Sequence, residues 1–175
     1  MAANTLTPTV ILADGTILER ILDTVHAVRP EGLGRGAFAT FHAAQAKTAW
    51  GRRHQQWYAL IDGSHVLASA LRYDLAGVLD GEPARVCGIS TAFADPNGDE
   101  GHVRELLRQL IGEAEREGAD VALLFAPADV TWTVPSGFES MSMPDLELGV
   151  TQSSRYGAPM TLVRGGEDPP SVSTS

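Results

Sequence analysis

The chain has 175 residues, of which 43% are hydrophobic and 20% are charged, a composition typical of one soluble globular domain and too apolar for a disordered chain. Its formal net charge of −9 argues against a nucleic-acid or anionic-membrane partner, because such surfaces need clustered lysines and arginines. No apolar run reaches membrane-spanning length, and the N-terminus lacks the basic and apolar regions of a signal peptide. Cys87 is the single cysteine, so an internal disulfide is impossible and a cytoplasmic location is expected.

The first half of the chain predicts one strand, two helices and then three strands. The segment TVILADG is typical of a short strand and turn, and apolar residues recur at helical spacing from Thr16. Glycine-rich PEGLGRG breaks this pattern, and a second helix is predicted near Ala37 to Ala49, with Phe38 and Phe41 on one face. The segment QQWYALIDGSHVLASALRYDL predicts a hairpin around Asp62-Gly63-Ser64, and ARVCGISTAFA predicts a further strand.

The second half contains the clearest element, a helix with apolar residues at i, i+3, i+4, i+7, i+8 and i+11, namely Val103, Leu106, Leu107, Leu110, Ile111 and Ala114. Gly118 ends the pattern, as glycine often does after a helix. The apolar run ADVALLFAP predicts a central strand covered on both faces. TWTVPSGF predicts a short helix that Pro135 ends early, and ESMSMPDLELGV and PMTLVRGG predict two late strands. Residues 165–175 have little to bury and are expected to be disordered.

This order of elements predicts an α/β fold with a mixed central sheet, and the sequence also resembles a known family. VLASALRYDL, VCGISTAFADP, the helix from Gly101, GADVALLFAP and PSGF follow the order and spacing of the GNAT superfamily of acyl-CoA-dependent N-acyltransferases. The resemblance covers roughly Thr7 to Arg164. It implies one GNAT-like domain at residues 1–164, with the mixed sheet flanked by helices on both faces.

In the GNAT family, the turn before this helix holds the CoA pyrophosphate through the pattern Gln/Arg-x-x-Gly-x-Gly/Ala. Free backbone N–H groups and the helix dipole favour the anion there. Alignment through the paired leucines puts Gly98, Gly101 and Val103 at the three patterned positions. Only Gly101 fits, since the basic or amide side chain is missing and Val103 adds a β-branched group.

Two carboxylates make this turn unfavourable for an anion. Asp99 and Glu100 would each repel a phosphate charge about 6 Å away by roughly 1 to 3 kcal/mol. Asp99 is also a favoured helix N-cap, and a cap accepts hydrogen bonds from the same N–H groups that the pyrophosphate would use. The alternative is a purely structural role, in which both acids stabilise the start of the helix.

A second departure from the family lies downstream. The resemblance implies a tyrosine that protonates the leaving CoA thiolate, and counting back from Gly137-Phe138 puts Thr133 at that position. A threonine hydroxyl is not a comparable acid near neutral pH. This difference and the turn together favour loss of ordinary acetyl transfer.

Candidate cleft residues come from strand parity and from the resemblance. Ser69, Leu71 and Tyr73 share one face of their strand, while Ala70, Arg72 and Asp74 share the other. The family places the ends of this strand and the next at a cleft between splayed strands. The predicted catalytic candidates are therefore Tyr73, Asp74, Ser90, Thr91 and, from the second helix, His42. Structural hydrogen bonding or packing is the alternative for each residue, and Arg72 and Asp74 are close enough to pair with each other.

Other chemistry is poorly supported. DPNGDE resembles the start of a calcium loop, but Glu100 and Leu106 stand where that loop needs glycine and glutamate, so no metal site is predicted. Cys87 lies in a predicted buried strand with no histidine beside it, which favours packing over nucleophilic catalysis. His102 is expected to be a solvated histidine, with an anion contact as the alternative.

Three functions remain open. In the first, the protein has lost ordinary acetyl-CoA use, and its cleft serves another small-molecule reaction or binds a ligand. In the second, it is an N-acyltransferase with an unusual donor site, in which Phe93, Gly101 and His102 bind acetyl-CoA or another acyl-CoA and strand amides near Phe93 polarise the thioester. In the third, it is a non-catalytic interaction module that forms a homodimer through its late strands.

Overall fold

The computed structural model describes residues 7–28, 32–96, 98–125 and 138, all within the compact unit Met1–Phe138. The elements follow in the order β1 (Thr9–Leu12), α1 (Gly15–Val28), α2 (Arg35–Lys47), α3 (Ala49–His54), β2 (Gln55–Asp62), β3 (His65–Leu79), β4 (Glu82–Ala94), α4 (Glu100–Arg116) and β5 (Val121–Phe125). This sequence of strands and helices is the predicted one, except for α3.

The strands form one mixed sheet in the order β1-β2-β3-β4-β5. The first four strands pair antiparallel, whereas β5 pairs parallel to β4 after the crossover through α4. A parallel neighbour needs such a crossover connection because both strands run in the same direction. The predicted α/β fold with a mixed central sheet is therefore confirmed.

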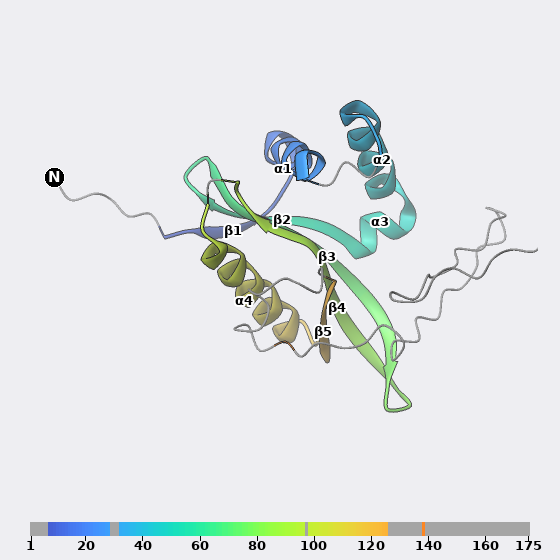
Figure 1. Cartoon of the computed structure of the whole chain (residues 1–175). Coiled ribbons are helices and arrows are strands. Elements are labelled where there is room, and N and C mark those ends of the chain that lie inside the picture. The colour runs from blue at the N-terminus through green and yellow to red at the C-terminus, as the bar shows by residue number, and fades with distance from the viewer. Residues whose placement is uncertain (1–6, 29–31, 97, 126–137, 139–175) are drawn as a thin grey trace, which may run out of the picture. The chain divides into compact units, whose positions relative to one another are not determined.

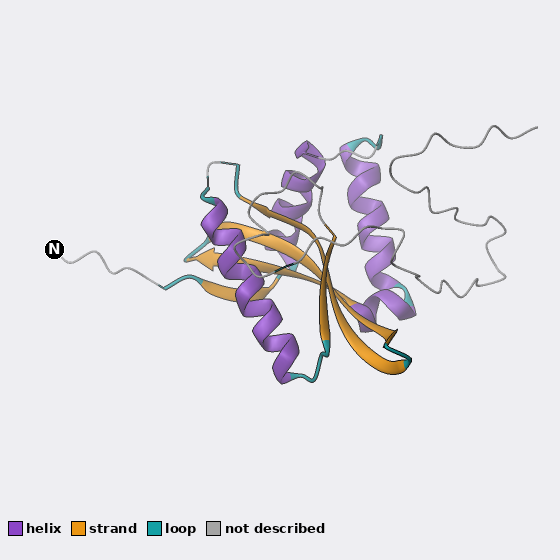
Figure 2. Ribbon diagram, turned by 60° about the horizontal axis from the view of Figure 1, so that its bottom comes forward, coloured by secondary structure: helices purple, strands orange, loops and turns teal. Residues whose placement is uncertain are grey.

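Helices cover both faces of this sheet, as Figures 1 and 2 show. On one face, α4 packs its apolar stripe against β2, β3 and β4, and the buried side chains there include Leu60, Ile89 and Leu106. On the other face, α1 and α2 bury Ile21 and Phe38 against the same strands. Each helix buries one apolar stripe on the sheet, so two cores share one sheet.

The sheet contains two β-bulges, one in the β2–β3 ladder and one in the β3–β4 ladder. In the β2–β3 ladder, Leu60 pairs with Ala68 and Ile61 with Val66, which leaves Leu67 as an extra residue. In the β3–β4 ladder, Ser69 pairs with Phe93 and Leu71 with Ser90, so two residues of β4 oppose one of β3. β-bulges of this kind bend a strand and increase its twist, and they occur often beside functional sites.

Two local predictions differ from the structure. The six-residue α3 was not predicted; Thr48 caps its start by accepting a hydrogen bond from the Gly51 N–H at 2.8 Å. Phe38 is buried as expected, but Phe41 on the same face is 45% exposed. Among the described strands β5 pairs with β4, and Val121–Phe125 is only partly buried. The predicted central position of this strand depends on late segments outside the described residues.

Several predictions lie outside the described residues. These are the late strands at 139–150 and 159–166, nearly all of the short helix at 131–138, Thr133 and the tail at 165–175. Within the described ranges, no helix combines the length and apolarity needed to cross a membrane.

Candidate functional site

In the turn before α4, the Asp99 carboxylate caps the N-terminus of the helix. Asp99 has extended backbone angles and is the N-cap of α4, and its Oδ1 accepts a hydrogen bond from the Gly101 N–H at 2.8 Å. The Asp99 carbonyl oxygen accepts a second bond from the His102 N–H at 2.9 Å. The first N–H groups of a helix otherwise lack partners. The predicted N-cap role of Asp99 is therefore confirmed, and two of the donors that an anion would use already have acceptors.

Gly101 provides room for this cap. A Cβ atom at Gly101 would lie 3.3 Å from both Asp99 carboxylate oxygens, closer than side chains normally approach. Glu100 adds a second negative charge in the first turn of α4, and the sequence has no lysine or arginine from Asp95 to Gly101. A helix N-terminus attracts negative charge, and here the chain supplies that charge itself.

The strand that leads into this turn carries a strained residue. Thr91 lies in the β4 bulge with a φ of 52°, a left-handed conformation that β-branched residues rarely adopt. Its hydroxyl lies 3.3 Å from that of Ser90. The ladder to β5 ends at the pair Ser90 and Phe125, while β4 continues to Ala94. Beyond Ser90, no described strand pairs with this side of β4.

The predicted cleft residues occupy different places. Tyr73 and Ser90 are on the α1/α2 face: Tyr73 packs against that core, and Ser90 lies opposite Leu71 of the same core. The Tyr73 ring is 6.1 Å from that of Trp50, and the His42 ring is 4.4 Å from that of Phe38. The structure therefore places Tyr73 and His42 beside aromatic rings, in agreement with the packing alternative.

Asp74 does not join these residues, because it extends from the opposite face of β3. Its carboxylate accepts a hydrogen bond from Arg72 at 3.0 Å, so the alternative that the two residues pair is confirmed and a cleft shared by Tyr73 and Asp74 is not. The Arg72 side chain is 4% exposed and also pairs with Glu117 of α4. Burial opposes its charge, but the bond to Glu117 and the charge of Asp74 outweigh this effect and raise the pKa of Arg72.

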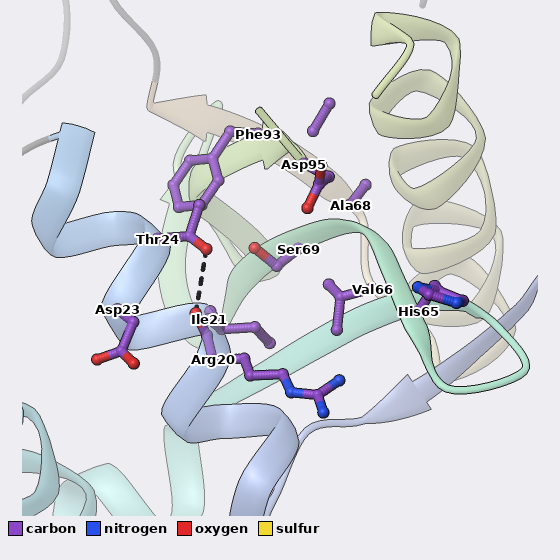
Figure 3. Close-up of a pocket in the computed structure, with 11 residues that line it drawn as sticks. Arg20, Ile21, Asp23, Thr24, His65, Val66, Ala68, Ser69, Phe93 and Asp95 are labelled. Atoms are coloured by element: carbon purple, nitrogen blue, oxygen red, sulfur yellow. Dashed lines mark hydrogen bonds between the residues drawn. The ribbon is translucent and has the colours of Figure 1, made fainter. Parts of the chain in front are cut away.

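A pocket of about 350 Å³ lies between α1 and the neighbouring ends of β3 and β4, between the two bulges. Figure 3 shows side chains from all three elements around it. Its lining consists of Arg20, Ile21, Asp23, Thr24, His65, Val66, Ala68, Ser69, Phe93, Ala94 and Asp95. This volume is near the lower end for small-molecule sites, so the pocket is the candidate binding site.

Phe93 is the one predicted site residue that lines this pocket. Sequence reasoning missed the polar residues from α1, because more than fifty positions separate helix α1 from strand β4 and no local pattern connects them. Parity did place Ser69 on the same face as Tyr73, and this was the available signal for the pocket. Ser69 is 3% exposed at the pocket wall.

The remaining candidates have structural surroundings. His102 is partly buried in the first turn of α4 and does not line the pocket. Cys87 is 1% exposed in the α4-side core, and burial raises the pKa of its thiol. Since a thiolate is the reactive form, the predicted packing role of Cys87 is confirmed. Among the described residues, no group of three or more His, Cys, Asp or Glu side chains is arranged to hold a metal ion.

No family model matches the sequence, and no curated protein matches it, whereas solved structures do. A probable acetyltransferase aligns with a TM-score of 0.62 and 12% identity, over 83% of this chain and 99% of that chain. The aminoglycoside N-acetyltransferase AAC(6′)-Iy in complex with CoA aligns with a TM-score of 0.60 and 13% identity, over 86% of this chain and 96% of that chain.

A predicted acetyltransferase with acetyl-CoA from Clostridium acetobutylicum aligns with a TM-score of 0.58 and 15% identity, over 81% of this chain and 96% of that chain. At such low identity the likeness concerns the fold, and one fold supports many functions. The mixed sheet, the crossover through α4 and the similarity to these solved structures show that the chain has the fold of the GNAT acetyltransferases.

Proposed function

We propose that this GNAT-fold protein has lost ordinary acetyl-CoA use and that its cleft serves a different small molecule. The observation that carries the proposal is the hydrogen bond from the Gly101 N–H to Asp99 Oδ1 at the start of α4. A pyrophosphate at this helix would have to displace the Asp99 carboxylate and then remain beside its charge and that of Glu100.

The estimated energies oppose the binding of a pyrophosphate at the start of α4. Displacing an N-cap costs about 1 kcal/mol, and each carboxylate about 6 Å from a phosphate charge adds roughly 1 to 3 kcal/mol of repulsion at an effective dielectric of about 20 to 40. Since about 1.4 kcal/mol is a factor of ten in affinity, the sum amounts to several powers of ten. The turn has no basic side chain from Asp95 to Gly101 to offset this cost.

The pocket beside α1 supports a small-molecule role over a pure interaction module. It combines the buried Ser69 with the charged Arg20 and Asp95 and the aromatic Phe93. Polar groups beside an aromatic side chain can fix the orientation of a bound ligand.

Calorimetry with acetyl-CoA and CoA tests the proposal. The unsubstituted chain is expected to give no binding up to about 1 mM, whereas Asp99→Gly with Glu100→Arg is expected to bind because the cap and both negative charges are gone. The matched control is Asp80→Gly with Glu115→Arg, which makes the same change in net charge at two exposed positions away from the turn. Glycine suits position 80 because Asp80 has a φ of 52°.

Micromolar binding of acetyl-CoA to the unsubstituted chain would overturn the proposal. If the turn variant folds and still ignores CoA, the two acids are not the obstacle, and Val103 becomes the residue to replace next. If the control variant gains CoA binding equally, net charge rather than the turn controls affinity.

A second candidate function is N-acyl transfer, and the β4 bulge favours it. Strained residues with positive φ cluster at functional sites, and Thr91 lies where β4 separates from β5. In that case an amine would attack an acyl thioester beside the free edge of β4, near Phe93, with a strand amide polarising the carbonyl. Micromolar acetyl-CoA binding would support this function and exclude the first.

A further inference from the structure

The buried wall of the pocket under α1 is apolar except for one hydroxyl. Ser69 lies on the α1/α2 face of β3, opposite Ala59 of β2 and Phe93 of β4. Its neighbours on this face, such as Ile21 and Leu71, belong to the apolar core. Ser69 is therefore a single polar group set into an apolar surface.

The Ser69 hydroxyl makes no hydrogen bond to any residue that the structure describes. Figure 3 shows it pointing from β3 towards α1, into the pocket. A buried hydroxyl without a hydrogen bond is unfavourable. The partner of this hydroxyl therefore comes from the contents of the pocket, either solvent or a bound molecule.

Thr24 of α1 offers a complementary group on the helix side of the pocket. Its hydroxyl donates a hydrogen bond to the Arg20 carbonyl oxygen at 3.1 Å, drawn as the dashed line in Figure 3. The proton of Thr24 is thus in use, but its oxygen can still accept a bond. A ligand group that accepts from Ser69 and donates to Thr24 suits both walls, and an alcohol does both.

The charged side chains of the lining lie at its rim. Arg20, His65 and Asp95 are exposed, and the Asp23 side chain is 45% exposed. Asp23 also accepts two hydrogen bonds from Arg35, and Asp95 is not free either. An ion in the buried part would have no countercharge beside it, which is costly. The buried part of the pocket therefore suits an uncharged molecule.

The apolar side chains of the lining suit a small ring. Phe93, Ile21 and Val66 line the pocket, and aromatic pairs are stabilised in offset or edge-to-face contacts. The volume of about 350 Å³ favours a single ring over a larger ligand.

We infer that the pocket binds a small uncharged alcohol. The ligand hydroxyl accepts a hydrogen bond from Ser69 and donates one to Thr24, and its apolar body packs against Phe93 and Ile21. This inference rests on the proposed small-molecule role of the cleft and adds the chemical class of the ligand.

The probe is benzyl alcohol, compared with benzylamine and benzoate, which keep the ring and add a charge. Binding is followed by the NMR chemical shifts of the backbone amides, which also locate the site. Benzyl alcohol is expected to shift the amides around Ser69 and Phe93 saturably, with a Kd on the order of 1 mM. Both charged compounds are expected to bind at least about tenfold more weakly, because their charge would be buried without a partner.

Ser69→Ala tests the hydrogen bond itself. It is expected to weaken benzyl alcohol binding about fivefold, the factor that corresponds to about 1 kcal/mol for one hydrogen bond. The midpoint of urea unfolding should not fall, because the lost hydroxyl bonds no described residue. The matched control is Ser64→Ala, an exposed serine in the β2–β3 turn that does not line the pocket, and it should keep the full affinity.

The absence of saturable shifts at about 20 mM benzyl alcohol would overturn the inference, as would equal binding of the three compounds or full affinity in Ser69→Ala. A lower urea midpoint for Ser69→Ala would also overturn it, because the hydroxyl would then be bonded within the protein. Acetyl-CoA is titrated into the same samples. Failure of benzyl alcohol with no acetyl-CoA binding refutes the ligand class alone, whereas micromolar acetyl-CoA binding refutes the proposed function whatever the alcohol does.

Discussion

Acidic side chains lie at both ends of α4, and they are stabilised differently at each end. At the N-terminal end, Asp99 and Glu100 are exposed, and the Asp99 carboxylate caps the helix directly. At the C-terminal end, Glu113 and Glu117 surround the buried guanidinium of Arg72. The helix dipole favours acids at the first end and disfavours them at the second.

This difference shows which acids need a partner cation. The acids at the start of α4 are stabilised by the helix itself, and no lysine or arginine occurs from Asp95 to Gly101. Those at the end need a cation, and the chain provides two: Arg72, and Arg85, whose guanidinium donates to the Glu117 carbonyl oxygen. The first arrangement puts the chain's own carboxylates at the helix N-terminus, and the second joins α4 to the sheet.

Removing the cation at the C-terminal end should have the largest effect. Arg72→Met leaves Asp74, Glu113 and Glu117 close together without their common partner. Because these carboxylates are 42 to 47% exposed, water compensates in part, and the expected loss is about 2 kcal/mol in the free energy of unfolding, less than for fully buried pairs. Urea denaturation measures it.

The control is Arg108→Met, which breaks the exposed pair with Glu105 on the same helix. It should change the free energy of unfolding much less than Arg72→Met, since exposed pairs contribute little. Equal effects of the two substitutions would show that the buried Arg72 is not a special tie between α4 and β3.

Changing the N-cap should have a smaller effect and should separate shape from charge. Asp99→Ala is expected to cost about 1 kcal/mol in the free energy of unfolding because the Gly101 N–H loses its acceptor. Asp99→Asn should cost almost nothing, since asparagine caps equally well. If asparagine destabilises as much as alanine, the charge rather than the hydrogen bond stabilises the start of α4.

The smallest effect concerns pH. Hydrogen bonds from Arg108 and Gln109 lower the pKa of Glu105 from 4.5 to about 2. A depressed pKa gives stability that is present above pH 4.5 and is lost as the pH falls towards 2. Because the Glu105 side chain is 39% exposed, screening reduces the contribution to roughly 0.5 kcal/mol.

Urea unfolding of the unsubstituted chain and of Glu105→Gln, followed from pH 6 to about 2.5, tests this direction. The difference between them should shrink as the pH falls. A difference that stays constant across this range would mean that the ion pair does not contribute to stability.

Local sequence patterns predicted α4, its cap at Asp99 and the burial of Cys87, because each depends on a few neighbouring residues. Strand parity also allowed the pairing of Arg72 with Asp74. The same patterns missed α3, since six residues are too few to show a helical period. They also missed the bulge at Thr91, because nothing in the sequence marks a threonine for positive φ.

The candidate pocket was beyond local patterns for another reason. Arg20 belongs to α1, Ser69 to the first part of β3 and Asp95 to the turn after β4. These residues line one pocket in the folded protein. Distances of this kind depend on tertiary packing, and a single sequence does not encode them as a local period.

The most direct test of the central claim is a calorimetric titration of acetyl-CoA into the unsubstituted chain and into Asp99→Gly with Glu100→Arg. We expect no binding to the unsubstituted chain at about 1 mM and measurable binding to the variant. Micromolar binding to the unsubstituted chain would contradict it, because the Asp99 cap would then give way to the pyrophosphate at little cost.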